Sequence, residues 1–270
     1  MSTRMTMGAA CVIAMAAFAG GPAAAAPLTD FAGTLHTGYD HSSPGGGNQW
    51  FVGGAAAGPL GAPNLNFQVD VLFSDTWLSG LSQRSGSVGG ALFWAGADGR
   101  IGIRGEYDSV SHAGSAGLGI AFAEGYFGII TGMIKGGYVS TTGSGFGGRG
   151  GMVGAGAAIY VMPNLAITPA IEYANIVSGQ GCQICGRGSE SIMSPSVTAE
   201  FLLADALGPV LPIGALSVFG GYAYNQFRTF GIQSHSNEWL IGIRFYTGAG
   251  TLIDRHRNGT LNSFLTSTVF

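Results

Sequence analysis

The sequence carries very little charge for its length. Only 9% of its 270 residues are charged, with 11 Lys and Arg against 14 Asp and Glu, whereas 46% are hydrophobic. Soluble domains carry roughly a quarter charged residues, so this balance disfavours a water-soluble enzyme. The high apolar content also excludes a disordered chain. A net charge of -3 and the lack of any run of Lys or Arg argue against nucleic-acid binding.

The N-terminus has a single early positive charge followed by an uncharged apolar stretch. Arg4 precedes this stretch, which ends in small residues with Ala23 and Ala25 at the positions that a signal peptidase requires. This pattern is typical of a secretory signal peptide. We therefore predict a signal peptide over residues 1–25, export through the Sec pathway, and a mature chain that begins at Ala26.

Cysteine is scarce, and export would leave only Cys182 and Cys185 in the mature chain. A structural zinc site needs four ligands, and the mature chain would hold no further cysteine. We expect a local disulfide between the two, with a pair of free thiols as the alternative. The five histidines lie in separate segments and no Gly-x-Ser-x-Gly turn occurs, so we expect no metal, no cofactor and no enzymatic activity.

No long apolar run suits a transmembrane helix. Two stretches without charge, 150–171 and 206–227, contain repeated Gly and Pro, which lower helix propensity. The hydrophobic period is two instead. Apolar side chains alternate with polar or charged ones in 65–73, 100–108 and 237–247, which indicates strands with one apolar face.

Twelve segments are interpreted as strands, and most have the nine to twelve residues that a tilted strand needs to cross a bilayer. The weaker segments at 49–57 and 126–139 leave eight or ten strands as alternatives. The predicted connections alternate between long and short, as in outer-membrane barrels. The predicted strands are 31–40, 49–57, 65–73, 87–95, 100–109, 115–123, 126–139, 151–161, 165–174, 192–203, 215–226 and 237–247.

An exported all-strand chain in hydrocarbon must pair every backbone N–H and C=O, which requires a closed sheet. We therefore predict an all-β fold, a transmembrane antiparallel up-and-down β-barrel that forms one domain over residues 26–248. Aromatic residues near strand ends are expected to form the two girdles at the membrane interfaces. These residues are Phe31, Tyr39, Tyr107, Tyr126, Tyr138, Tyr173, Tyr222, Tyr224 and Trp239.

The signal peptide, the alternating segments and the sequence Gly-Ile-Arg-Phe-Tyr at 242–246 together resemble Gram-negative outer-membrane β-barrel proteins of the small porin-like class. The resemblance implies that Gly242, Phe245, Tyr246 and the terminal Phe270 form the signal that the barrel-assembly machinery reads. It also implies that outer-membrane lipid and lipopolysaccharide surround the barrel. Porins often trimerise, so the resemblance includes a homo-oligomer among the expected states of the chain.

Residues 249–270 follow the last predicted strand. An even number of strands places both chain ends in the periplasm, which makes this segment a periplasmic C-terminal tail. The alternative is that Leu261–Phe270 is the closing strand of the barrel.

Eight charged residues fall on the strand positions predicted to face the lumen, five acidic and three basic. Either they line a water-filled pore or they pair and close the barrel. We expect a porin-like channel for passive diffusion of ions or small solutes, with a mild cation preference. The alternative is a closed structural barrel or an adhesin-type barrel whose extracellular loops, such as 175–191, bind partners. The eight residues are Asp70, Arg104, Glu106, Asp108, Lys135, Glu172, Glu200 and Arg244.

Overall fold

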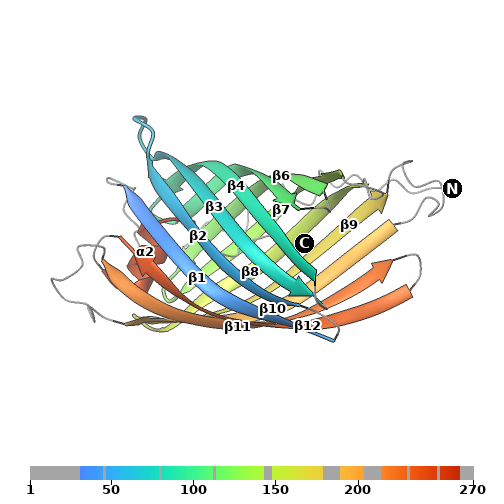
Figure 1. Ribbon diagram of the computed structural model, residues 1–270. Helices are drawn as coiled ribbons and strands as arrows, with labels where there is room; N and C mark the ends of the chain where they lie inside the picture. Colours follow the sequence, from blue (N-terminus) through green and yellow to red (C-terminus); the bar gives the residue numbers. More distant parts are fainter. Residues whose placement is uncertain are drawn as a thin grey trace.

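The structure is a computed structural model and describes residues 31–44, 47–78, 81–111, 114–142, 148–178, 189–203, 214–229, 232–247 and 250–261. The predicted signal peptide, the Cys182–Cys185 pair and Phe270 lie outside these residues, so their predictions stay untested. The described residues form a barrel of strands and one short helix (Figure 1).

Twelve antiparallel strands form one closed sheet. Each strand pairs with its neighbours in the sequence, and the sheet closes because β1 pairs with β12, for example Gly38 with Gly242. The predicted up-and-down barrel is confirmed with twelve strands, not eight or ten. The strands are β1 (Ala32–Ser43), β2 (Asn48–Pro59), β3 (Leu65–Leu78), β4 (Leu81–Gly96), β5 (Gly99–Val110), β6 (Gly114–Phe127), β7 (Ile130–Thr142), β8 (Gly148–Met162), β9 (Leu165–Ser178), β10 (Ser189–Leu203), β11 (Ala215–Thr229) and β12 (Ile232–Tyr246).

The strands extend further than their apolar segments predict. They run from 12 to 16 residues, and β4 begins at Leu81 instead of residue 87. Backbone pairing continues into polar sequence because the neighbouring strand still supplies partners. Ser85 is paired with Ser74 of β3, and their hydroxyl groups also form a hydrogen bond at 2.5 Å. The expected alternation of long and short connections is therefore wrong. All connections have five residues or fewer except 179–188, which follows β9, and 204–214, which follows β10.

The two ends of the barrel are called the terminal rim and the far rim. The terminal rim holds the start of β1, the end of β12 and the tight turns at 97–98, 128–129 and 163–164. The far rim holds the other set of connections, such as 44–47. At the terminal rim, Gly128 adopts a φ of 56° between β6 and β7, the left-handed conformation that two-residue hairpin turns favour.

The outer wall is apolar. Val69 and Val71 are 50% and 41% exposed there, whereas Asp70 between them points inward and is less exposed. An outer surface of this kind suits lipid. Exposed aromatic side chains on this wall include Phe31, Tyr39, Trp50, Trp77, Trp94, Tyr107, Tyr138, Tyr173 and Trp239.

Tyr126 does not belong to the predicted girdle. It is only 1% exposed and lies inside the barrel, because it shares the inward-facing positions of Phe122 and Glu124 on β6. Within the described ranges, no helix has the length and apolar character needed to cross a membrane.

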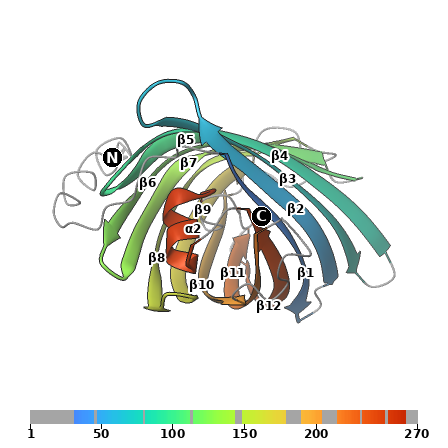
Figure 2. The same ribbon diagram turned by 90° about the vertical axis from the view of Figure 1, so that its left-hand side faces the viewer.

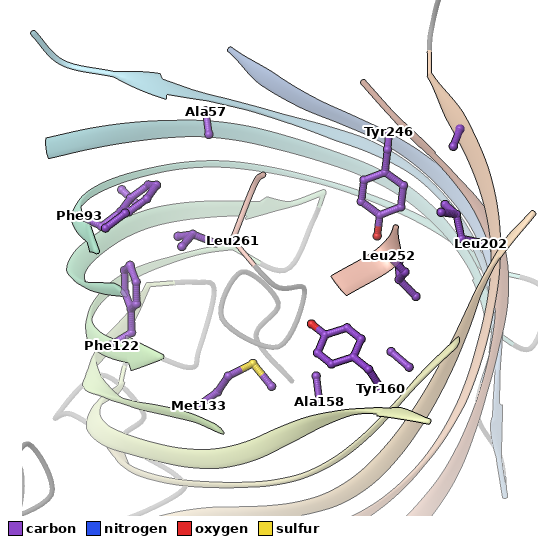
Figure 3. Packing of buried hydrophobic residues seen from close by; sticks show 14 residues of the cluster. Ala57, Phe93, Phe122, Met133, Ala158, Tyr160, Leu202, Tyr246, Leu252 and Leu261 are labelled. Carbon is purple, nitrogen blue, oxygen red and sulfur yellow. The ribbon is translucent and has the colours of Figure 1, made fainter. Parts of the chain in front are cut away.

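The barrel closes without the C-terminal segment. After β12, the chain turns back into the terminal rim and forms α2 (Leu252–Asn258), which lies within the ring of strands (Figure 2). Thr251 caps α2 by a capping box with Asp254. Leu252 is fully buried and packs with Leu261 and Tyr246 in the main apolar cluster (Figure 3).

Residues 250–261 thus belong to the barrel interior at the terminal rim. The remainder of the alternative closing strand, residues 262–270, lies outside the described part of the chain.

Candidate functional site

The structure places the eight predicted lumen residues on inward-facing strand positions. Seven of them pair with another of the eight, and Asp108 lies next to Glu106 on the same strand. Their elements are β3 for Asp70, β5 for Arg104, Glu106 and Asp108, β7 for Lys135, β9 for Glu172, β10 for Glu200, and β12 for Arg244.

The first ion-pair centre is built around Arg104. Its guanidinium binds both carboxylate oxygens of Asp70, with 2.6 Å between Nη2 and Oδ2. The same Nη2 also donates to Glu106 at 2.8 Å. Asp70 and Arg104 meet across β4 because Gly89 lies between their strands, and a Cβ at Gly89 would collide with the guanidinium. The bidentate geometry makes the Arg104–Asp70 ion pair strong and directional.

The second pair repeats the same design on nearby strands of the sheet. Lys135 on β7 and Glu172 on β9 meet at 2.8 Å across β8. Gly154 on β8 lies opposite both residues, so no side chain separates them. The glycines on the inward-facing positions thus let charges on next-nearest strands form pairs.

The third centre is built around Glu200. Its Oε2 accepts from Arg244 Nη1 at 2.6 Å, and its Oε1 accepts from Ser217 and Tyr246, each also at 2.6 Å. His256 of α2 lies 3.5 Å from Oε2. Glu200 therefore joins the wall of the barrel to the C-terminal helix.

A fourth charged centre was missed by the sequence reasoning. Arg100 and Glu124 pair at 3.8 Å with their side chains 1% exposed. Arg100 also donates to the backbone carbonyls of Arg257 and Thr260. Arg100 has the same inward-facing parity as Arg104, and this parity was the signal that could have identified it.

α2 and the residues around it are attached to many strands of the terminal rim. Arg257 donates to the carbonyls of Gly128 and Ile130, at 2.7 and 3.0 Å, and to the Thr131 hydroxyl at 3.1 Å. His256 lies between the hydroxyls of Tyr160 and Tyr246, at 3.1 and 3.0 Å. The Leu261 N–H donates to Gln68 on β3.

The attachments therefore reach strands around most of the ring, from β3 and β5 to β12. Figure 3 shows Tyr160 and Tyr246 projecting inward toward this segment, close to Leu252. The segment spans the mouth of the barrel at the terminal rim.

Two further acids, Asp40 on β1 and Glu238 on β12, face the interior near the far rim and were also missed. The part of the chain that the structure describes has no group of three or more His, Cys, Asp or Glu side chains arranged to hold a metal ion.

Of the predicted assembly signal, Gly242 and Phe245 lie on β12, where they pair with both β1 and β11. Tyr246 is 4% exposed and turns into the barrel toward Glu200. The structure thus gives Tyr246 a packing role, and its role in assembly stays a prediction.

No protein-family model matches the sequence, and no curated protein matches it. Solved structures do match in fold. An outer-membrane channel from Pseudomonas putida F1 gives a TM-score of 0.54 at 9% identity, covering 84% of this chain and 98% of that one. The NanC porin gives 0.53 at 8% identity and the KdgM porin 0.51 at 7%, each covering 78% of this chain and 98% of the other.

The closed twelve-strand barrel and these likenesses define the class of fold: an antiparallel up-and-down β-barrel similar to those of outer-membrane porins. The resemblance noted from the sequence is thereby confirmed at the level of fold.

Proposed function

We propose that this protein is a porin-like channel of the bacterial outer membrane for ions or small solutes, and that α2 restricts its lumen at the terminal rim. The observation that carries this proposal is the closed barrel with an apolar outer wall and a charged inner wall. Charged side chains in hydrocarbon need partners or water, and an interior lined by them suits the passage of hydrated solutes.

The restriction rests on the contacts of the C-terminal segment. Residues 250–261 enter the lumen and bond to strands on several sides of the ring. Arg257 alone makes three hydrogen bonds to the segment 128–131. A solute that passes the terminal rim must therefore go around this segment or displace it.

The inner wall also favours cations over anions, because its acids outnumber its bases. Asp108, Asp40 and Glu238 face the interior, and no salt bridge to any of them occurs among the described residues. A pore in which acidic groups outnumber basic ones concentrates cations. The mild cation preference expected from the sequence is proposed again on this basis.

A second candidate is a closed structural barrel. It is favoured by the near-complete burial of the Lys135 and Arg104 side chains, which are 0% and 1% exposed. An adhesin-type role depends on segment 175–191, of which residues 179–188 lie outside the described part. Association with lipopolysaccharide, recognition by the barrel-assembly machinery, a homo-oligomeric state and export through the Sec pathway also remain proposals.

Conductance of the refolded mature chain in planar bilayers separates the channel from the closed barrel. The wild-type chain should give small steps, and Arg257→Ala should give larger or longer-lived ones because α2 loses its bonds to the turn at 128–129. Arg84→Ala is the matched control, since Arg84 is 81% exposed at its side chain and lies near the far rim.

Two outcomes would contradict the proposal. Silence from both wild type and Arg257→Ala, with folding shown by heat-dependent gel mobility, would establish the closed barrel. Equal conductance of Arg257→Ala and wild type would mean that α2 does not restrict the pore. Ion preference is read from the reversal potential in a salt gradient, and Asp108→Asn should shift it toward anions.

A further inference from the structure

The pairing of the strands has two gaps among the described residues, and both lie at the outer edges of the hairpin formed by β9 and β10. Between β8 and β9, residues 157–158 have no partner in the register, and the gap lies opposite Pro169. Between β10 and β11, residues 224–225 have no partner, and this gap lies opposite Pro195. The other pairings of described strands run without such a gap.

A proline accounts for each gap. Proline has no backbone N–H, so it cannot donate to the strand beside it, and it is rare in central strands of a sheet. Pro169 and Pro195 both keep their partners inside the hairpin, which are Val197 and Ile171. The missing donors therefore belong to the outer edges of the hairpin, toward β8 on one side and toward β11 on the other.

Further irregularities lie at the same two edges. At the gap between β10 and β11, Ser194 and Asn225 are 2% and 4% exposed, and neither Ser194 Oγ nor Asn225 Oδ1 has a hydrogen-bond partner within the described ranges. Buried polar atoms without partners cost free energy, so they weaken this edge. The ladder between β8 and β9 also shifts its register between Tyr160 and Met162.

A buried ion pair crosses each of these edges. Lys135 on β7 binds Glu172 on β9 at 2.8 Å, across the edge between β8 and β9. Arg244 on β12 binds Glu200 on β10 at 2.6 Å, across the edge between β10 and β11. In both pairs the hairpin supplies the acid and the rest of the barrel supplies the base. Side chains thus join the hairpin to the barrel where the backbone pairing is incomplete.

We propose that the β9–β10 hairpin is a section of the barrel wall that opens as one unit, and that these two ion pairs are the latches at its edges. The pairing inside the hairpin is unbroken, whereas each outer edge lacks backbone bonds, so the hairpin separates from β8 and β11 more readily than β9 separates from β10. Opening moves Glu200 away from His256, 3.5 Å away on α2, and so loosens the segment at the terminal rim.

This inference goes beyond the channel proposal and does not depend on it. A barrel that conducts no ions can still open at this hairpin, and a conducting barrel can have a rigid wall. Opening is measured below without any ion current, so the two proposals fail separately.

Amide hydrogen exchange, read residue by residue by NMR on the refolded mature barrel in detergent micelles, tests the hairpin. The amides that join β9 to β8 and β10 to β11 should exchange roughly tenfold faster than those that join β3 to β4, where the pairing has no gap. The amides that join β9 to β10 should stay as slow as those between β3 and β4.

Three variants sharpen the test. Glu172→Gln removes one latch and should speed exchange at both outer edges of the hairpin roughly threefold. Asp70→Asn is the matched control, because it breaks a similar ion pair with Arg104 that crosses uninterrupted pairings, and it should leave exchange in β9 and β10 unchanged. Pro195→Val supplies the missing N–H and should slow exchange at the edge between β10 and β11.

The proposal is overturned if the outer edges of the hairpin in the wild-type barrel exchange no faster than β3 and β4, and this measurement decides the question even if no variant folds. It is also overturned if Glu172→Gln speeds exchange at the β8–β9 edge alone, because each edge then opens locally and the hairpin does not move as a unit. Folding of each variant is checked by heat-dependent gel mobility.

Discussion

The two rims of the barrel differ in how their interior charges are balanced. At the terminal rim, α2 and Arg100 supply basic groups and N–H donors that bind strand carbonyls and side chains. At the far rim, neither Asp40 nor Glu238 forms a salt bridge with any of the described residues. The same strand alternation therefore gives paired charges around α2 at one end and acids without a salt bridge at the other.

The difference shows that the strands of the wall alone do not determine the charge balance of the interior. Twelve strands provide similar inward-facing positions at both ends, and among the described residues the segment that returns into the lumen, 250–261, lies at the terminal rim. The segment after the last strand thus adds basic groups and hydrogen bonds to the interior at the terminal rim. Substitutions that remove contacts at the terminal rim test how much those contacts stabilise the barrel and α2.

The largest effect is expected from Glu200→Gln. This change leaves Arg244 with a side chain only 12% exposed and no ionic partner, and Ser217 and Tyr246 lose a charged acceptor. Removing one member of a buried ion pair costs about 3–5 kcal/mol. Urea unfolding of the refolded barrel, followed by tryptophan fluorescence, should show the loss.

Glu190→Gln is the control for this comparison, because Glu190 belongs to the same strand near the far rim and has no salt bridge among the described residues. Equal stability of Glu200→Gln and wild type would mean that water solvates Arg244 and that the terminal half of the lumen is wet.

A smaller effect is expected from Leu252→Ala in α2. Leu252 is fully buried, and removing a buried Leu side chain costs about 2–3 kcal/mol where the surroundings relax partly. The substitution should destabilise the docking of α2 against the barrel and leave the pairing of the strands unchanged. Trypsin cleavage after Arg255 and Arg257, followed by mass spectrometry, should become faster by one to two orders of magnitude.

Leu35→Ala is the matched change on the outer wall, where Leu35 is 55% exposed, and it should leave the cleavage rate unaltered. If Leu252→Ala instead lowered the urea midpoint of the whole barrel without faster cleavage, α2 would unfold together with the strands.

The smallest effect is expected from Thr251→Ala. Thr251 Oγ1 accepts from the Asp254 N–H at 3.4 Å, and Asp254 Oδ2 accepts from the Thr251 N–H at 2.9 Å. Loss of an N-cap costs about 1 kcal/mol, so the trypsin rate should rise roughly fivefold. Thr251→Ser keeps the hydroxyl and should behave like the wild type. Equal rates for Thr251→Ala and Thr251→Ser would show that packing alone holds α2.

The strands were predictable because their signal is local. Alternation within a segment such as 100–108 is enough to assign a strand and to say which side chains face inward, and the structure places Arg104 and Glu106 on the inner wall accordingly. Strand ends were less predictable, because polar segments such as 81–86 become strand only when a neighbouring strand offers backbone partners.

The ion-pair partners of the inner wall were not predictable. Which base meets which acid depends on the register of strands far apart in sequence, as when Arg244 meets Glu200 over β11. Tyr126 was misplaced for a related reason, because an aromatic near a strand end suits both the outer interface and the inner wall.

The sequence by itself determined that the chain forms a membrane-type barrel, because low charge, alternation and the absence of helix-forming runs act locally and need no partner. Only the tertiary structure decided that α2 enters the lumen, that four basic side chains of the wall pair with acids, and that Asp40 and Glu238 form no salt bridge within the described ranges. The physical reason is that ion pairing and burial depend on distances in space, and closure of the sheet between β1 and β12 fixes those distances.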